Sequence, residues 1–262
     1  MNTTQMDETG KGQLILALES SAGPASCALL RWNPKGTNRL VASAAAHTGL
    51  THSQTLLPMV GSLLRHAGLS IDDVDILAVS AGPGSFTGIR IGVSAVKGLA
   101  FARNLPCAGV STLAAMARGI EGMPFEGIIL AAMDARCAQI YTASFACEKG
   151  RISRLTPDEA LTIEEVGGRL QNLPEFAKKS IFIVGDGAEI CYNALRDKVP
   201  GLILAPETLR YQQAAGVALE AAMVAGKGGL ITATGLMPRY LRLPQAEREL
   251  RARRQAPPEQ GN

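Results

Sequence analysis

Short apolar runs separated by turn residues predict that the chain begins with β-strands. Residues 13–18 (QLILAL), 25–30 and 40–46 are mostly apolar, and the turn-forming stretches ESSAGP and WNPKGTN lie between them. Three short strands joined by tight turns are typical of an antiparallel meander. We therefore expect a three-stranded meander at the start of the fold.

The pattern then changes to helices that alternate with strands. Apolar residues recur at helical spacing over 53–67, where Thr51 or Ser53 can cap the helix and Gly68 can end it. A meander followed by such an alternation is typical of a ribonuclease-H-like layout, a mixed sheet with helices on its faces. The next expected elements are a strand over 75–80, a helix over 88–103 and a strand over 107–110.

A second cycle of the same kind begins near residue 127 and predicts a second half that loosely repeats the first. Its expected elements are strands over 127–133, 138–145, 151–155 and 181–184 and helices over 162–173 and after GDGAE, followed by a last Ala-rich helix over 212–225. The predicted fold class is therefore α/β, with two ribonuclease-H-like halves whose mixed sheets are flanked by helices.

This order of elements also predicts the domain boundaries. We expect residues 13–105 together with 207–230 to form the first domain and residues 106–206 to form the second. Residues 1–12 and 244–262 are expected to be flexible tails.

Composition and charge exclude several classes of protein. Of the 262 residues, 47% are hydrophobic and 19% are charged, which excludes a wholly disordered chain and a coiled coil. The net charge is +3, and residues 239–262 hold six Arg against three Glu. A neutral body with a basic end does not indicate a dedicated nucleic-acid-binding domain. The C-terminal arginines could contact phosphates, although a solvated tail is the interpretation that we favour, so any contact with nucleic acid should be indirect or through this basic C-terminal tail. These arginines are Arg242, Arg248, Arg251, Arg253 and Arg254.

Cysteine spacing and the lengths of the apolar runs indicate the compartment. The five cysteines are at least ten residues apart and form no C-x-x-C pair, which favours reduced thiols. The polar N-terminus, MNTTQMDETGKG, is not typical of a signal peptide. The apolar runs are far shorter than a membrane span. We therefore expect a soluble cytoplasmic protein without a membrane partner.

Two Gly-rich loops are candidates for nucleotide binding. GPGSFTG and GDGAE each follow an expected strand and open an expected helix, where backbone N–H groups can bind an anion. Neither loop is a Walker A or G-x-G-x-x-G motif, so a tight structural turn stays an alternative for both. The weak candidates for cofactor binding are Gly82, Gly84, Ser85, Gly185 and Gly187.

These loops also raise the hypothesis of an ATPase or kinase with a cleft between the halves. Such an enzyme needs acids to hold Mg²⁺, and the candidates are Glu19, Asp134 and Asp186. For Asp134 we favour a different interpretation, in which its side chain shapes the turn after its strand.

Histidines and serines give no catalytic set. His47, His52 and His66 are spaced so that no pair shares a helix face as i, i+4 metal ligands would. Ser85 is not in a G-x-S-x-G elbow. We therefore predict no catalytic residues, no metal site and no cofactor.

The helix expected over 88–103 is apolar on more than one side. Ile89, Val93 and Val96 form one stripe, and Ile91 and Leu99 belong to another. A helix of this kind must be covered on more than one side. Two interpretations stay open: burial under the helix over 53–67 of the same chain, or a protein partner that docks across both helices.

Several strings together resemble the TsaB family of tRNA threonylcarbamoyladenosine biosynthesis proteins. They are ILALESSAGPASCALL, the stretch from HSQTLLPMVGSLLRHAGLS to GPGSFTGIRIGVSAVKGLA, then MDARCAQIYTASF, VGDGA and PRYLR. The similarity covers roughly residues 13–245, and GPGSFTGIRIG is its most specific string. The resemblance implies the ASKHA (actin-like ATPase) fold.

The resemblance also implies a pseudo-enzyme subunit without cofactors. In such systems TsaD transfers threonylcarbamoyl to N6 of adenosine 37 in tRNAs reading ANN codons, TsaC makes the threonylcarbamoyl-adenylate, and TsaE supplies an ATPase. The enzyme branch carries a His-x-x-x-His metal pair, and here Thr112 and Met116 stand in those positions. The implied role is therefore a non-catalytic scaffold that activates TsaD.

The implied partner is TsaD in a heterodimer, with TsaE in a larger ATP-dependent complex and a homodimer of the isolated chain as a further possibility. Pairing would use the helices expected over 53–67 and 88–103. The resemblance does not indicate which face of these helices points outward. The interface residues expected on this basis are Leu56, Met59, Val60, Leu63, Ile89, Val93, Val96 and Lys97.

Overall fold

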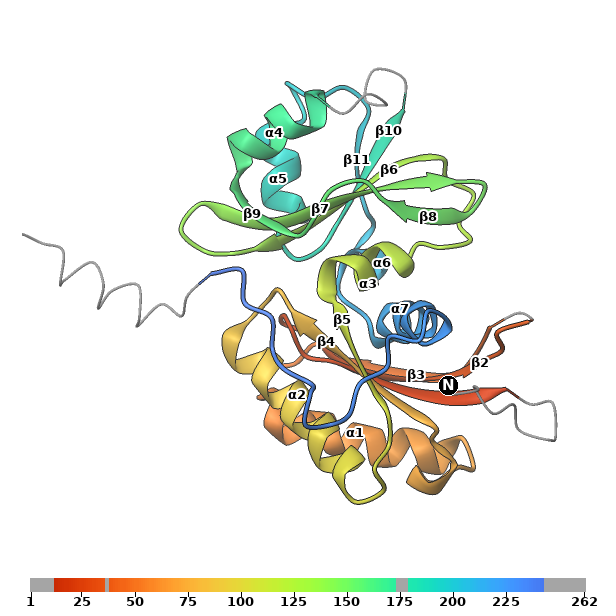
Figure 1. Ribbon diagram of the computed structural model, residues 1–262. Helices are drawn as coiled ribbons and strands as arrows, with labels where there is room; N and C mark the ends of the chain where they lie inside the picture. The colour runs from red at the N-terminus through yellow and green to blue at the C-terminus, as the bar shows by residue number, and fades with distance from the viewer. Residues whose placement is uncertain (1–11, 36–37, 173–178, 243–262) are drawn as a thin grey trace, which may run out of the picture.

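Two mixed sheets, each flanked by helices, make up the computed structural model, which describes residues 12–35, 38–172 and 179–242 (Figure 1). The first sheet has the strand order β3-β2-β1-β4-β5 and the second β11-β10-β6-β7-β8. The strands of the first sheet are β1 (Gln13–Glu19), β2 (Ala25–Trp32), β3 (Arg39–Ala46), β4 (Ile76–Gly82) and β5 (Cys107–Ser111). Those of the second are β6 (Gly127–Asp134), β7 (Gln139–Glu148), β8 (Arg151–Arg154), β10 (Ser180–Val184) and β11 (Leu202–Leu204), with β9 (Glu159–Thr162) paired to β7.

Both sheets have the same topology, which confirms the predicted repeat. In the first, β1, β2 and β3 form an antiparallel meander, and β4 and β5 add in parallel beside β1. In the second, β6, β7 and β8 form the meander, and β10 and β11 add in parallel beside β6. Each domain is therefore ribonuclease-H-like, and the pair has the expected ASKHA-like architecture.

Helices cover both faces of the first sheet because its central strands are apolar at successive positions. On β1, Leu14, Leu16 and Leu18 pack toward one pair of helices, whereas Ile15 and Ala17 pack toward the other side. The helices on the first side are α1 (His52–His66) and α2 (Phe86–Phe101), and the main helix on the second side is α7 (Ala214–Gly226). A short 3₁₀ helix spans Ile71–Asp73.

The second sheet has helices of its own on one face. These are α4 (Ile163–Gln171) and α5 (Ala188–Leu195), which pack on Ile128, Leu130 and Ile183. Its other face is covered by α3 (Thr112–Arg118), with α6 (Glu207–Arg210) beside it, and both helices lie between the two sheets in Figure 1.

Two predicted domain boundaries are wrong. β5 pairs with β4, so residues through Ser111 belong to the first sheet, and the boundary expected between 105 and 106 lies too early. α6 belongs with the second domain, because the carbonyl of Arg210 accepts a hydrogen bond from the Gly185 N–H at 2.6 Å. Helix α7 packs on the first sheet as expected. The predicted tails, 1–12 and 244–262, lie outside the described residues, except for residue 12.

The chain passes from the first domain to the second at α3 and returns just before α7, and these two helices cross closely. A Cβ added at Gly216 of α7 would lie 2.1 Å from the carbonyl oxygen of Ala115 on α3, so only glycine permits this approach. Near the crossing, Arg118 Nε donates to Glu220 Oε2 at 2.9 Å. The two connections between the domains are therefore packed against each other.

Among the described helices, none has both the length and the apolar character needed to cross a membrane.

Candidate functional site

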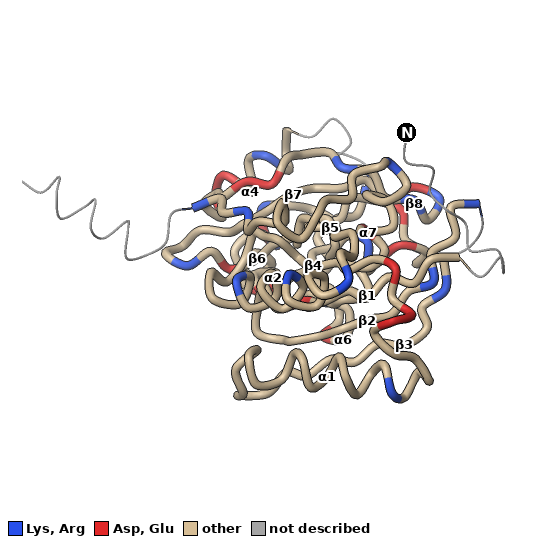
Figure 2. Tube along the Cα trace, turned by 60° about the horizontal axis from the view of Figure 1, so that its bottom comes forward, with Lys and Arg blue, Asp and Glu red and all other residues tan. Residues whose placement is uncertain are grey.

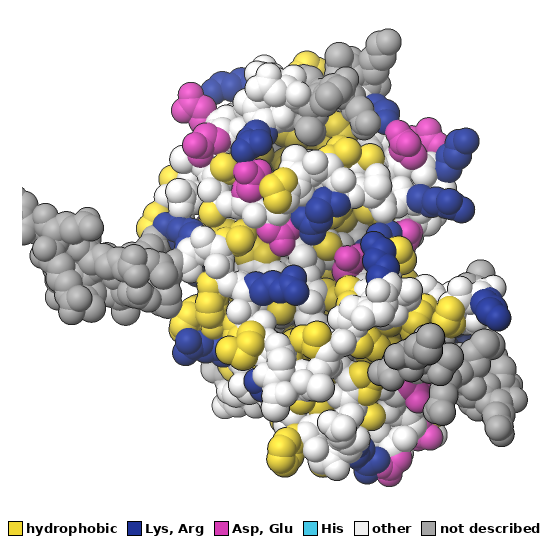
Figure 3. All heavy atoms as spheres, viewed as in Figure 1, with side chains coloured by type: hydrophobic (Ala, Val, Ile, Leu, Met, Phe, Trp, Pro, Cys, Tyr) yellow, Lys and Arg dark blue, Asp and Glu magenta, His cyan; other side chains and the backbone are white. Residues whose placement is uncertain are grey.

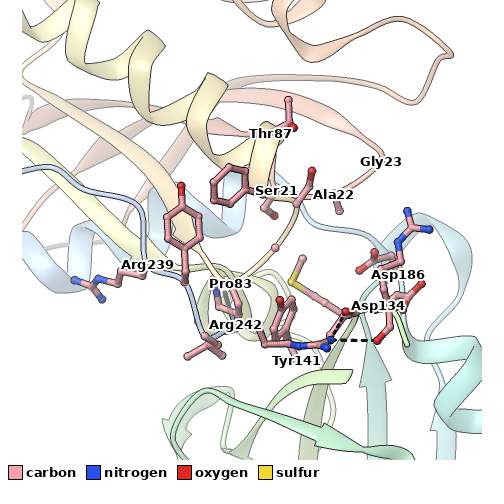
Figure 4. A pocket seen from close by; sticks show the side chains of 18 residues that line it. Ser21, Ala22, Gly23, Pro83, Thr87, Asp134, Tyr141, Asp186, Arg239 and Arg242 are labelled. Atoms are coloured by element: carbon pink, nitrogen blue, oxygen red, sulfur yellow. Dashed lines mark hydrogen bonds between the residues drawn. The ribbon is translucent and has the colours of Figure 1, made fainter. Parts of the chain in front are cut away.

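A cleft of about 500 Å³ lies between the two domains (Figure 4). Its walls come from parts of the chain that are far apart in sequence. They are the β1–β2 turn, the loop that opens α2, the end of β6 with its following turn, Asp186, and the segment after α7. The two Gly-rich loops singled out from the sequence therefore meet at one cleft, as the hypothesis of a nucleotide-binding cleft requires.

The glycines of the first loop allow the chain's own backbone to approach. A Cβ at Gly82 would lie 2.1 Å from the carbonyl oxygen of Arg239, and a Cβ at Gly84 would lie 2.6 Å from that of Ser21. Both residues have positive φ angles, +128° and +155°. The backbone geometry of this loop therefore has a structural explanation that needs no ligand.

Ser85 has a structural task at the same place. It is the N-cap of α2, and its Oγ accepts a hydrogen bond from the Gly88 N–H at 3.3 Å. Its own N–H donates to the carbonyl of Ser21 at 2.7 Å. These bonds join the start of α2 to the β1–β2 turn.

The second loop packs on β6. A Cβ at Gly185 would lie 1.9 Å from the carbonyl oxygen of Ala132, and a Cβ at Gly187 would lie 2.8 Å from the backbone nitrogen of Asp134. Of this loop, the residue that lines the cleft is Asp186.

The three candidate Mg²⁺ ligands lie in different environments. Asp134 and Asp186 line the cleft, whereas Glu19 is fully buried at the end of β1. The Glu19 carboxylate accepts hydrogen bonds from the Ser80 hydroxyl and the Ser21 N–H. Burial raises the pKa of Glu19 despite these bonds. The cleft therefore offers two carboxylates, and no cluster of three or more His, Cys, Asp or Glu residues suited to a metal occurs in the described part of the chain.

The two cleft carboxylates already have protein partners. Asp134 Oδ1 accepts the Arg136 N–H at 2.7 Å, so the favoured turn-shaping role is confirmed. Asp186 Oδ1 accepts a hydrogen bond from Gln212 Nε2 at 2.8 Å. Burial is the main cause that raises the pKa of Asp186, and the nearby Asp134 charge acts in the same direction.

The turn between β6 and β7 is strained and lies at the edge of the cleft. Arg136, Cys137 and Ala138 have consecutive φ angles of 63°, 54° and 56°, a left-handed conformation that costs roughly 1–2 kcal/mol per residue without glycine. Arg242 Nη1 donates to the carbonyls of Ala135 and Arg136 at 2.7 and 3.2 Å, the dashed bonds in Figure 4. Arg242 was expected to contact solvent or phosphate, and it binds this turn instead.

The other C-terminal arginines considered for phosphate contact lie outside the described residues. They are Arg248, Arg251, Arg253 and Arg254.

The face formed by α1 and α2 corrects the predicted partner interface. Six of the expected residues are buried against their own sheet, because the chosen stripe of each helix is the one that faces the core. These six are Leu56, Val60, Leu63, Ile89, Val93 and Val96. Met59 and Lys97 are half-buried, and Lys97 Nζ donates to the carbonyl of Leu236 at 3.1 Å.

The accessible face of these helices is a groove between them, of about 630 Å³. It lies on the second apolar stripe of α2, where Ile91 and Ala95 are half-buried, and Leu57 of α1 is 47% exposed. Its lining is completed by His52, Ser53, Leu56, Phe86, Thr87, Arg90 and Ser94. Helix α1 thus covers α2 only in part, and part of the second apolar stripe of α2 is accessible.

The positions where related enzymes are expected to carry histidines lie in α3. Thr112 and Met116 are both buried, and Met116 packs in the core of the second domain. Sequence reasoning did not predict α3.

Comparison with known proteins gives consistent relatives. Residues 46–249 match the family described as "TsaD: tRNA N6-adenosine threonylcarbamoyltransferase". The chain is 36% identical over 204 residues to the tRNA threonylcarbamoyladenosine biosynthesis protein TsaB of Escherichia coli, covering 71% of this chain and 84% of that protein. It is 31% identical over 239 residues to the protein of the same name from Bacillus subtilis, with coverages of 89% and 96%.

A solved structure, YeaZ from Pseudomonas aeruginosa, is similar along most of the chain. The TM-score is 0.71 at 30% identity, and the match covers 87% of this chain and all of that one.

Proposed function

The chain belongs to the TsaB family of tRNA threonylcarbamoyladenosine biosynthesis proteins, and from this premise we propose that it is a non-catalytic subunit that binds and activates TsaD. TsaD would carry out the transfer of threonylcarbamoyl to N6 of adenosine 37 in tRNAs that read ANN codons. The observation that carries the proposal is the open apolar groove between α1 and α2.

The groove has the character of a helix-docking surface. The lining residues include the exposed Leu57 and the half-buried Ile91 and Ala95, with no acidic residue among them. Along the same outer side of α2, Ser94 and Gly98 are exposed and small, so a partner helix can approach closely. Figure 2 shows that α1 carries almost no Lys, Arg, Asp or Glu along its length.

The one charged residue lining the groove sets an expectation for the partner. Arg90 is exposed at the rim, beside Phe86 and Thr87. A partner helix that fits would present apolar residues to the groove and an acidic residue opposite Arg90.

The chemistry of α3 supports the non-catalytic part of the proposal. Where the metal-binding enzymes have two imidazoles, this chain has the hydroxyl of Thr112 and the thioether of Met116, and both are buried. Neither side chain supplies the nitrogen ligand that a histidine would give to a catalytic metal.

The test is reconstitution of threonylcarbamoyl transfer to unmodified tRNA with TsaC, TsaD and TsaE, with and without this chain. We expect modification only when both this chain and TsaD are present. Modification without TsaD would make this chain the catalyst and refute the scaffold role. Modification that does not change when the chain is left out would refute the activating role.

One observation favours a second candidate, an ATPase or kinase activity of the inter-domain cleft. Both helix-opening loops reach this cleft together with the carboxylates of Asp134 and Asp186. Calorimetry of the isolated chain with ATP and Mg²⁺ tests it, since binding heat would support this candidate and its absence would refute it.

A further inference from the structure

The segment after α7 runs from the first domain to the second. Ile231 forms an antiparallel bridge with Cys107 of β5, with N–H to carbonyl distances of 2.7 and 2.9 Å. Leu236 is then buried against the first domain, at the position where Gly109 has no side chain. In Figure 1 the segment continues beside α2 and ends next to the second sheet. We call residues 236–242 the C-terminal clamp.

The clamp is fixed to the first domain by backbone contacts. The N–H of Arg239 donates to the carbonyl of Ala81 at 2.6 Å, and Lys97 of α2 holds the carbonyl of Leu236. The missing side chain at Gly82 leaves room for the carbonyl of Arg239. This part of the segment therefore has a defined path rather than that of a loose tail.

Tyr240 connects the clamp to the helix that forms the groove. Its ring stacks on Phe86 with a centroid distance of 4.8 Å, and its hydroxyl accepts a hydrogen bond from Arg90 Nε at 2.9 Å. The Arg90 guanidinium also lies over the Phe86 ring, 3.9 Å from its centroid. Phe86 lines both the cleft and the groove, so this cluster of three side chains lies between the two hollows.

Arg242 connects the clamp to the second domain through the strained β6–β7 turn. Its guanidinium donates to two successive carbonyls, those of Ala135 and Arg136. Figure 4 shows these bonds on the far side of the cleft from the α2 helix. Charge-assisted bonds of this kind are the stronger hydrogen bonds in proteins.

We propose that the C-terminal clamp holds the two domains together across the cleft and fixes Phe86 and Arg90 at the partner-docking groove. The crossing of α3 and α7 joins the domains at one place, and the clamp joins them at a second. The first part of this inference stands on the structure of the chain alone. The second part, the coupling of the clamp to docking, rests on the proposed function.

Hydrogen exchange of the full-length chain alone tests the first part. Arg242→Ala removes the contact with the second domain, and we expect the amides of Ala135 and Gln139, which are bonded within the turn, to exchange at least about tenfold faster. Arg239→Ala is the matched control, because it removes an exposed guanidinium of the same segment and keeps the backbone bond to Ala81. Unchanged exchange in Arg242→Ala would overturn the clamp.

Affinity for TsaD, measured by calorimetry with the same chains, tests the coupling. We expect Arg242→Ala and Tyr240→Ala to weaken binding about tenfold, although Arg242 does not line the groove. Arg239→Ala should bind as the wild type does, and Tyr240→Phe, which keeps the ring, should lose less affinity than Tyr240→Ala. Wild-type affinity in Arg242→Ala, despite faster exchange, would overturn the coupling and leave the clamp. A wild-type chain that does not bind TsaD would instead refute the proposed function and with it the coupling, while the exchange experiment still decides the clamp.

Discussion

Two positions on α2, two residues apart, separate the role of the core from the role of the groove. Val93 is 3% exposed and packs in the core between α2 and the first sheet, whereas Ala95 is half-buried and lines the groove. Val93→Glu would lose about 1.5–3 kcal/mol of apolar burial. It would also place an unpaired carboxylate in the core at a cost of several kcal/mol more. Against a typical stability of about 5–15 kcal/mol, this change should unfold much of the protein.

Ala95→Glu should leave the fold nearly intact and damage docking. Both residues are good helix formers and the site reaches solvent, so the free energy of unfolding should change by no more than about 0.5–1 kcal/mol. A charge in an apolar groove must be desolvated when a partner covers it, so the affinity for TsaD should fall by about 2 kcal/mol or more, roughly 30-fold.

Urea denaturation followed by circular dichroism gives the first quantity, and calorimetry with TsaD gives the second. A Val93→Glu chain with the wild-type unfolding midpoint would refute the assignment of Val93 to the core. An Ala95→Glu chain that is well folded and binds TsaD normally would refute the groove as the docking surface.

Three further experiments test other parts of the structure. Because burial raises the pKa of Glu19, the folded state holds this proton more tightly than the unfolded state, so stability should fall as the pH rises above the ordinary value of 4.5. Glu19→Gln should remove that loss, and its stability advantage over the wild type should grow by up to about 1.4 kcal/mol per pH unit, which urea titrations at pH 5, 6 and 7 would show or exclude. Gly216→Ala should destabilise the chain by about 1–3 kcal/mol because its Cβ meets the backbone of α3, and an unchanged melting temperature would contradict the close crossing. A thiol reagent at pH 8 should label Cys137 rapidly and the other four cysteines only after unfolding. Those four are buried, and burial raises the pKa of Cys27 and Cys191 to about 12. If mass spectrometry found several cysteines labelled at early times, this prediction would be refuted.

Continuous apolar runs made most of the fold predictable. Strands such as 14–18 are apolar at every position, and turn residues on both sides limit their length, so both meanders and the parallel strands β4, β5 and β10 followed from the sequence. The short strands β9 and β11 were not predicted. Helix α3 was missed because no turn residue separates it from β5. Ser111 ends the strand and also caps the helix, since its Oγ accepts a hydrogen bond from the Ala114 N–H.

The site was less predictable, for two physical reasons. A helix with two apolar stripes gives no sign of which stripe faces its sheet, and the stripe chosen for docking was the buried one containing Val93 and Val96. The clamp has no helical or strand periodicity, because its order comes from single contacts such as that of Arg242 with the carbonyls of a distant turn. Figure 3 shows hydrophobic side chains gathered at the side of the molecule where this segment passes α2, a grouping that spacing along the chain does not reveal.

The second domain is an uninterrupted stretch of sequence inserted into the first, and this determines the order in which the protein can be completed on the ribosome. All strands of the second sheet are synthesised before α7. Until α7 emerges, the face of the first sheet that carries Ile15, Ala17 and Ile76 lacks its main helical cover. The second domain can therefore fold while it is being made, whereas the first waits for the last part of the chain. A nascent chain that stops before Ala214 would present this apolar face to chaperones and proteases.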